Sequence, residues 1–341
     1  MKALVYTAPH AVEVQELPDP LPDPDDVVVR VSACGICGSD VHGFQGRSRI
    51  RIPPMVMGHE FTGRIAERGT RIENLDMGQR VVVQPIVGCG QCALCLEGRP
   101  NICPARQLIG GHRPGAFAEY VRVPARVVYP IPDRLDDTGA ALVEPLANAA
   151  HMLRRGSARE YTDVVVLGAG TLGLVTVALA RLTGARRVIA TDTDSHRLKI
   201  ARHLGADLTL DARDPDTTDR ILEVTGGGAE VVIEAVGVSI TRQQAIAVAR
   251  PGATVTLLGN LEPDSELPLL DVINREIDLR GSYASTDRDF RGAIAVLADG
   301  HIETHSWVEI TSLERGQEYF ERLSTSPGGL VKAQFAIAQG A

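Results

Sequence analysis

The sequence has no run or stripe of basic residues. Its 43 Asp and Glu outnumber its 35 Lys and Arg, which gives a formal net charge of −8 at pH 7. Nucleic acids and anionic membranes attract basic surfaces, so this balance argues against both as partners. The first residues, MKALVYTAPH, also lack the basic and then apolar pattern of a secretion signal. We therefore expect a cytoplasmic protein that acts on a small molecule.

Long apolar stretches are also lacking. The longest stretch without a charged residue covers 164–180, which is shorter than the roughly 20 residues of a membrane span. It contains Gly168, Gly170 and Gly173, so a strand, a tight turn and a buried helix explain it better than a span does. No internal repeat or low-complexity tract is evident.

The length and the hydrophobic pattern predict two domains. A chain of 341 residues exceeds what one core usually spans. Residues 1–147 hold short β-branched runs broken by Pro, Gly and Asp, which is typical of a barrel-like β domain with long loops. In 148–285 apolar strands alternate with helix-length segments, which predicts a doubly wound parallel sheet. We expect an α/β fold in which 286–341 forms a further segment.

A glycine motif in the second domain predicts a dinucleotide site. Residues 168–173 read Gly-Ala-Gly-Thr-Leu-Gly, directly after an apolar strand and at the start of an apolar helix. In this context Gly168 permits the tight turn, Gly170 lets a pyrophosphate approach the backbone, and Gly173 lets helix and strand pack closely. The helix start at Thr171 and Leu172 supplies free N–H groups for the phosphates.

Asp192 predicts which dinucleotide is bound. It ends the next strand, 19 residues after Gly173 (192 − 173), where an acid would bind the ribose diol. A carboxylate there would repel a 2′-phosphate, so the sequence favours NAD over NADP. Arg197 is either a contact to the adenine or ribose or an exposed helical charge.

Four cysteines predict a closed metal site. Cys89, Cys92, Cys95 and Cys103 lie within a loop at about 88–104 that is rich in Gly and Pro. Four thiolates fill the tetrahedral coordination of a structural zinc. An iron–sulfur cluster is the alternative, but the long last spacing and a second zinc constellation favour zinc.

That second constellation lies in the first domain. Cys37 belongs to the segment GICGSDVH, and His59 and Glu60 follow in the segment GHE. Glu144 lies where the two predicted domains meet in the sequence. A catalytic zinc takes about three protein ligands and keeps one position open, so Cys37, His59 and a carboxylate would suit it.

Together these motifs resemble those of the zinc-containing medium-chain alcohol dehydrogenases. GICGSDVH, GHEFTG, the cysteine loop, EPLA and GAGTLG occur in the order found in that family, over essentially the whole chain. The resemblance is closest to the branch of sorbitol, threonine and sugar-alcohol-phosphate dehydrogenases. It implies a GroES-like β-barrel catalytic domain, interrupted by a Rossmann domain that binds NAD, with 286–341 returning to the catalytic domain.

The resemblance also implies roles for individual residues. Cys37 and His59 would bind the catalytic zinc together with Glu60 or Glu144, a choice that the sequence leaves open. Ser39 and His42 would carry the alcohol proton away, while hydride passes to the nicotinamide. Residues that would border the cofactor are Asp192, Arg197, Leu258, Gly259 and Tyr283.

Two positions depart from the animal sorbitol dehydrogenases that the chain resembles. Gly43 stands where those enzymes have a tyrosine, and Ala284 where they have an arginine. Both changes remove polar groups that face a polyol, and a glycine at position 43 would leave room for a bulkier, cyclitol-like substrate. We therefore expect an NAD-linked, zinc-dependent dehydrogenase that oxidises a secondary alcohol of a small polyol, sugar alcohol or cyclitol to a ketone.

Other functions remain open at this point. One is a threonine-type amino-alcohol dehydrogenase, and another is a zinc- and NADH-binding relative without turnover. The second is disfavoured because the sequence keeps the complete set of catalytic residues, namely Ser39, His42, Cys37 and His59. A zinc-free quinone reductase is disfavoured as well, since it would lack the zinc ligands and the cysteine loop. The resemblance further implies a homodimer or homotetramer formed through Rossmann sheet edges, with 277–283 as the edge strand.

Overall fold

A computed structural model describes residues 1–325 and 329–337 of the chain. The chain forms two units. The first combines Met1–Glu144 with the chain from Thr286 onward, and the second is Pro145–Ser285. Among the described residues, no helix is long and apolar enough to cross a membrane.

Strand β3 (Asp26–Gly35) is the centre of the first unit. It pairs antiparallel with β5 (Glu60–Arg68), with β9 (Tyr120–Pro124) and with β18 (Lys332–Ala336). Its run of valines is buried, as expected for β-branched residues in a central strand. The other strands of the unit are β1 (Lys2–Ala8), β2 (Ala11–Glu16), β4 (Met55–Val56), β6 (Arg80–Val83), β7 (Ile86–Val87), β8 (Gln107–Leu108), β10 (Val128–Pro130) and β17 (Val308–Thr311).

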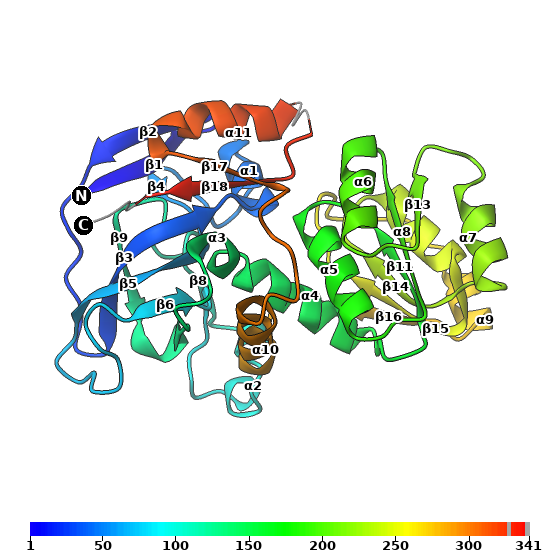
Figure 1. The fold of residues 1–341 in the computed structure, drawn as a ribbon, viewed down its shortest axis with the longest axis horizontal. Helices are drawn as coiled ribbons and strands as arrows, with labels where there is room; N and C mark the ends of the chain where they lie inside the picture. The colour runs from blue at the N-terminus through cyan, green and yellow to red at the C-terminus, as the bar shows by residue number, and fades with distance from the viewer. Residues whose placement is uncertain (326–328, 338–341) are drawn as a thin grey trace. The chain divides into compact units, whose positions relative to one another are not determined.

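The end of the chain completes the core of this first unit. Figure 1 shows β18, in red, among the blue strands from the start of the chain. Phe320 stacks on Phe44 with ring centroids 5.1 Å apart, and Phe335 meets Phe117 edge-on at 5.1 Å. Such ring pairs add to the burial of apolar area, so the late segment and the early segments form one core.

The helices of the first unit connect its strands. Their bounds are α1 (Gly38–Phe44), α2 (Ala93–Leu96), α3 (Asp137–Ala140), α10 (Asp287–Ala298) and α11 (Gly316–Thr325), with 3-10 turns at Pro100–Ile102, Ala125–Val127 and Leu313–Arg315.

The second unit is a six-stranded parallel sheet with its own core. Its strand order is β13-β12-β11-β14-β15-β16, which is the 3-2-1-4-5-6 order of a doubly wound dinucleotide fold. Every residue of β11 is buried, which requires cover on both faces of the sheet. The strands are β11 (Asp163–Leu167), β12 (Arg187–Asp192), β13 (Leu208–Asp211), β14 (Ala229–Glu234), β15 (Ala249–Leu257) and β16 (Asp278–Gly281).

Helices alternate with these strands, as the sequence predicted. They are α4 (Val143–Arg155, which starts at the end of the first unit), α5 (Thr171–Leu182), α6 (Ser195–His203), α7 (Thr217–Thr225), α8 (Ser239–Ala247) and α9 (Leu269–Asn274). Figure 1 shows α5 and α6 beside this sheet in green. The predicted α/β fold class is confirmed.

Candidate active site

Three potential metal ligands of the first unit come together in space. The ligand atoms of Cys37, His59 and Glu60 all lie within 4.8 Å of one another, and His59 and Glu60 are buried. Sulfur, nitrogen and oxygen donors bound to one tetrahedral zinc lie roughly 3.3–3.8 Å apart, so small side-chain movements suffice to bind the ion. The donor set therefore fits zinc.

Strand pairing places these ligands. Gly35 at the end of β3 is the register partner of Glu60 at the start of β5, and Cys37 follows β3 directly. A Cβ atom at Gly35 would collide with Glu60 Oε2, so only glycine leaves space for the carboxylate. The two loops therefore converge because β3 and β5 pair in this register.

The buried carboxylate of Asp40 supports two of the ligands. Its Oδ2 accepts the backbone N–H of Cys37 at 3.0 Å, and its Oδ1 lies 3.3 Å from His59 Nδ1. A carboxylate partner of this kind orients a metal-binding imidazole. Burial disfavours a charge on His59, yet Asp40 and Cys37 raise the pKa of His59 well above its ordinary value. A cation is thus favoured at this point of the structure.

Lys332, which the sequence did not reveal as a site residue, forms a buried ion pair with Glu60. Its ammonium contacts Glu60 Oε2 and donates to the carbonyl of Ile36 at 3.0 Å. Burial opposes the charge, but Glu60, Cys37 and Glu144 raise the pKa of Lys332 above its ordinary value. Glu144 is therefore near enough to act on Lys332, although it lies outside the group formed by Cys37, His59 and Glu60.

Ser39 and His42 both lie on α1. They are three residues apart and thus share one side of the helix. Burial lowers the pKa of His42, and the positive charges of Arg47 and Arg51 lower it further. His42 is therefore neutral at pH 7 and able to accept a proton.

The interpretation of Gly43 as room for a larger substrate was wrong. Gly43 is buried, and a Cβ atom there would lie 2.5 Å from Arg51 Cδ and 3.0 Å from Met57 Sδ. The space beside Gly43 is filled by the protein's own arginine. The expectation of a cyclitol substrate loses this support.

The four cysteines of the loop form the predicted cluster. The sulfurs of Cys89 and Cys95 are 3.9 Å apart, and those of Cys92 and Cys103 are 3.7 Å apart. Four sulfurs at about 2.3 Å from one zinc would be about 3.8 Å from each other, so the spacing fits a tetrahedral ion. Backbone N–H groups of Gln91 and Cys92 lower the pKa of Cys89 to about 6.

Cys95 shows why this cluster needs a cation. The backbone N–H of Gly90 lowers its pKa, but burial and the other three cysteines raise it to about 11. Four thiolates this close repel one another, and a divalent ion relieves the repulsion.

The glycine loop of the second unit has the geometry of a phosphate cradle. Gly168 has a φ of 97°, and a Cβ atom at Gly173 would collide with the carbonyl oxygen of Gly168. Gly170 caps α5, and a Cβ atom there would meet nothing within 4 Å. This open space above the helix start, at Thr171 and Leu172, fits a pyrophosphate.

Asp192 is fixed at the end of β12 beside this loop. Its Oδ2 accepts the N–H of Ala169 at 2.7 Å, and its Oδ1 accepts the N–H of Asp194 at 2.9 Å. Arg197 Nη1 lies 4.0 Å from Asp192 Oδ2. The carboxylate cannot turn away without losing two hydrogen bonds.

The remaining predicted cofactor residues follow strands of the same sheet. Leu258 and Gly259 follow β15, and Tyr283 follows β16, so they share the edge at which parallel strands end. No sequence motif indicates Glu234, which is fully buried at the end of β14. Glu234 accepts hydrogen bonds from the N–H groups of Val236 and Gly237 and from Thr241 Oγ1, and so shapes the loop beside the glycine motif.

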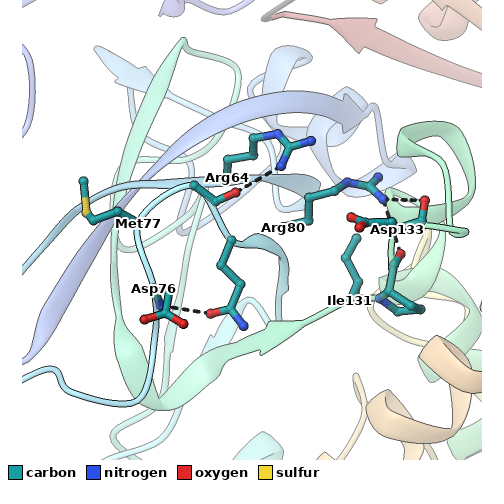
Figure 2. A pocket seen from close by; sticks show the side chains of 9 residues that line it. Arg64, Asp76, Met77, Arg80, Ile131 and Asp133 are labelled. Atoms are coloured by element: carbon teal, nitrogen blue, oxygen red, sulfur yellow. Dashed lines mark hydrogen bonds between the residues drawn. The ribbon is translucent and has the colours of Figure 1, made fainter.

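A surface pocket of the first unit carries none of this chemistry. Figure 2 shows this pocket, which is lined by Arg64 of β5 and Arg80 of β6. Arg80 donates to the carbonyls of Pro132 and Asp133 and pairs with Asp137, and Arg64 donates to Gly78. Its guanidinium groups are therefore engaged within the protein.

Comparison with known proteins places the chain in a family. A family model described as "Alcohol dehydrogenase GroES-like domain" matches residues 23–133, and one described as "Zinc-binding dehydrogenase" matches residues 171–299. The sorbitol dehydrogenase of Bacillus subtilis (strain 168) is 35% identical over 332 residues, which cover 94% of this chain and 93% of the relative. The L-threonine 3-dehydrogenase of Rhizobium johnstonii is 36% identical over 293 residues, 83% of each chain.

Solved structures agree with this result. A zinc-binding dehydrogenase from Sinorhizobium meliloti 1021 bound to NADP has a TM-score of 0.90 at 34% identity and covers 98% of both chains. An alcohol dehydrogenase from Escherichia coli CFT073 complexed with NADH has a TM-score of 0.92 at 29% identity, with 98% of this chain and 99% of that chain covered. The chain belongs to the zinc-binding alcohol dehydrogenase family, which confirms the resemblance and the enzyme class inferred from the motifs.

The cysteine cluster gives a testable prediction about stability. Replacing Cys95 with Ser removes one of four sulfur donors, so the zinc content should fall from about two ions per chain to about one. The melting temperature should fall as well, because the ion cross-links the loop that holds it. Metal analysis and thermal unfolding test both expectations.

Cys34→Ser is the matched control, since Cys34 belongs to neither group of potential ligands. That variant should keep both ions. A Cys95→Ser protein with the zinc content and melting temperature of the parent would contradict the assignment.

Proposed function

We propose that this protein oxidises a secondary alcohol of a small polyol or sugar-like substrate to a ketone, with NAD as hydride acceptor. The observation that carries the proposal is the group of Cys37, His59 and Glu60 within 4.8 Å, with Ser39 and His42 on the helix that follows Cys37. The glycine loop and Asp192 of the second unit supply the cofactor site.

Each residue has a defined part in this chemistry. Cys37, His59 and Glu60 would hold the zinc, which when bound supplies Lewis-acid polarisation of the alcohol oxygen. Ser39 Oγ accepts the alcohol proton and passes its own proton on. His42 is neutral at pH 7 and receives it. NAD carries away the hydride.

Glu60 rather than Glu144 is our choice for the third ligand, because only Glu60 belongs to the group of close donors. Because the ion pair with Lys332 engages Oε2, Glu60 would bind the metal through Oε1.

The substrate class has two candidates, each favoured by a relative. The Bacillus subtilis relative is named for sorbitol, and the Rhizobium johnstonii relative for L-threonine. We propose a polyol as substrate. A screen of NAD reduction with polyols, L-threonine and simple secondary alcohols separates the two candidates. A protein that binds zinc and NADH but reduces NAD with none of these substrates would be a non-catalytic relative.

The variant Cys37→Ser tests the mechanism directly. We expect turnover of the best substrate from the screen to fall at least about 1,000-fold, because the thiolate ligand is lost. NADH binding, measured by fluorescence titration, should stay near that of the parent, which serves as the internal control for folding. Parental turnover in this variant would refute the zinc site.

We further propose that NAD is preferred over NADP, although one structural relative binds NADP. The reason is that two backbone hydrogen bonds hold the Asp192 carboxylate at the end of β12, where it would repel a 2′-phosphate. Arg197 Nη1 lies 4.0 Å from Asp192 Oδ2, at the outer limit of an ion pair.

Asp192→Ala should therefore raise the ratio of kcat/KM for NADP to that for NAD by about 10-fold or more, which corresponds to about 1.4 kcal/mol. Asp211→Ala is the matched control, because Asp211 ends the neighbouring strand as the register partner of Asp192. The control should leave the ratio unchanged. An unchanged ratio in Asp192→Ala would remove this residue from cofactor selection.

We also propose that the protein is a homodimer or homotetramer in which a second copy covers the β16 edge. Among the described strands β16 pairs only with β15, so its other side offers free backbone groups. Helix α9, which precedes β16 in the chain, exposes Leu269, Leu270 and Ile273. A second β16 can continue the sheet, and the apolar helix can be covered by the same copy.

Ile273→Glu should shift the protein toward the monomer, because two added charges would face each other across the interface. Light scattering coupled to gel filtration measures the mass. Leu21→Glu, at an exposed apolar residue of the first unit, should keep the parental mass. A monomeric parent protein would rule out the proposed assembly.

A further inference from the structure

One buried arginine connects the metal ligands to the serine of the proton path. Arg51 Nε donates to Asp40 Oδ1 at 3.1 Å, and Nη2 donates to Ser39 Oγ at 3.0 Å. The same Nη2 lies 3.4 Å from His59 Nδ1. Only 4% of Arg51 is exposed. A single planar group thus reaches both the carboxylate partner of His59 and the hydroxyl of Ser39.

The surrounding chain is shaped to hold this arginine. Ser48 Oγ accepts the N–H of Arg51 at 3.1 Å, and the N–H of Arg47 donates to the carbonyl of His42 at 2.9 Å, so the loop folds back onto α1. On the helix, Gly43 leaves the space that the Arg51 side chain fills. An ion pair with Asp40 alone would not require the second contact, to Ser39.

We propose that Arg51 is a positioning residue of the dehydrogenase reaction, which fixes the Ser39 hydroxyl in the orientation that accepts the alcohol proton. This inference rests on the proposed role of Ser39. A serine hydroxyl has one O–H donor and two acceptor lone pairs. Arg51 occupies one lone pair, which leaves the other for the incoming proton and the O–H for the proton that is passed on.

The charge and shape of arginine both matter for this role. Its donors form a rigid planar fork, so fixing Nε on Asp40 also fixes Nη2 on Ser39. Lysine would keep a positive charge beside Asp40 but has one nitrogen, which cannot hold the same two partners at the ends of a fork.

The variant Arg51→Lys separates positioning from folding. Because lysine keeps the charge beside buried Asp40, the melting temperature, the zinc content and the KM for NAD should stay near the parental values. The kcat should fall about 10- to 100-fold, which is less than the roughly 10²–10⁴-fold contribution of a positioned proton-transfer group, because Ser39 itself is retained. Arg49→Lys, at an exposed arginine of the same loop, should leave all four quantities unchanged.

A double-mutant cycle with Ser39→Ala tests whether Arg51 acts through Ser39. In the Ser39→Ala background, Arg51→Lys should lower kcat no further, because the hydroxyl that it orients is absent. Effects that multiply independently would overturn the proposal. So would an Arg51→Lys enzyme with parental kcat, or one whose loss of activity merely follows loss of zinc.

The variant Gly43→Ala tests the position of Arg51 without changing any polar group. The added methyl would take the space of Arg51 Cδ, so we expect the guanidinium to shift and kcat to fall while the zinc content stays constant. Full activity in Gly43→Ala would contradict the proposal. A parent protein that reduces no NAD with any substrate would instead defeat the proposed function on which the role of Arg51 rests.

Discussion

The buried negative charge of Asp40 organises the metal site of the first unit. Its side chain has no exposed surface, and it accepts hydrogen bonds from Cys37 and Arg51 and lies beside His59. Burial disfavours the ionised carboxylate, but His59 and Arg51 lower the pKa of Asp40 to about 2. The charge thereby joins the loop that starts α1 to the loop that precedes β5. Strand pairing brings the two loops together, and the Asp40 carboxylate then holds their donors in place.

A second buried pair, Glu60 with Lys332, completes the balance of charge around this site. A buried ion that lacks its partner is costly, so each acid here has a base within contact distance. Lys332 reaches Glu60 only because β18 pairs with β3, which brings the end of the chain into the first unit. The site is therefore formed by segments separated by 272 positions in the sequence. The C-terminal return of the chain thus contributes to the candidate active site as well as to the core.

The parts that could be predicted from the sequence are those encoded by local spacing. The cysteine loop and the glycine motif each place their groups within a few residues, so turn geometry alone brings the donors together. Asp192 could be predicted because its distance in sequence from the glycine motif is that of one strand–helix–strand unit. Arg51, Lys332 and Glu234 could not be predicted in the same way. Their roles depend on strand pairing and on burial, which make an ordinary charged residue in a loop or strand into a partner of the site.

Gly43 is a case in which the sequence alone led to a wrong prediction. A glycine in place of a large side chain implies empty space only when no other residue fills it, and here Arg51 does. Spacing within the sequence could not show this, because the two residues meet through a folded loop. Our proposal of Glu60 over Glu144 as the third ligand likewise depends on tertiary structure, because the register of β3 and β5 places Glu60 near Cys37.

The most direct test of the account is the position of the metal ions in a crystal of the purified protein. Anomalous diffraction measured on both sides of the zinc absorption edge should reveal two ions per chain. One should lie among the four cysteine sulfurs, and the other should be bound by Cys37 Sγ and a nitrogen of His59, with one coordination position free of protein donors. Absence of zinc between Cys37 and His59, or a fourth protein donor that closes that position in every crystal form, would contradict the account.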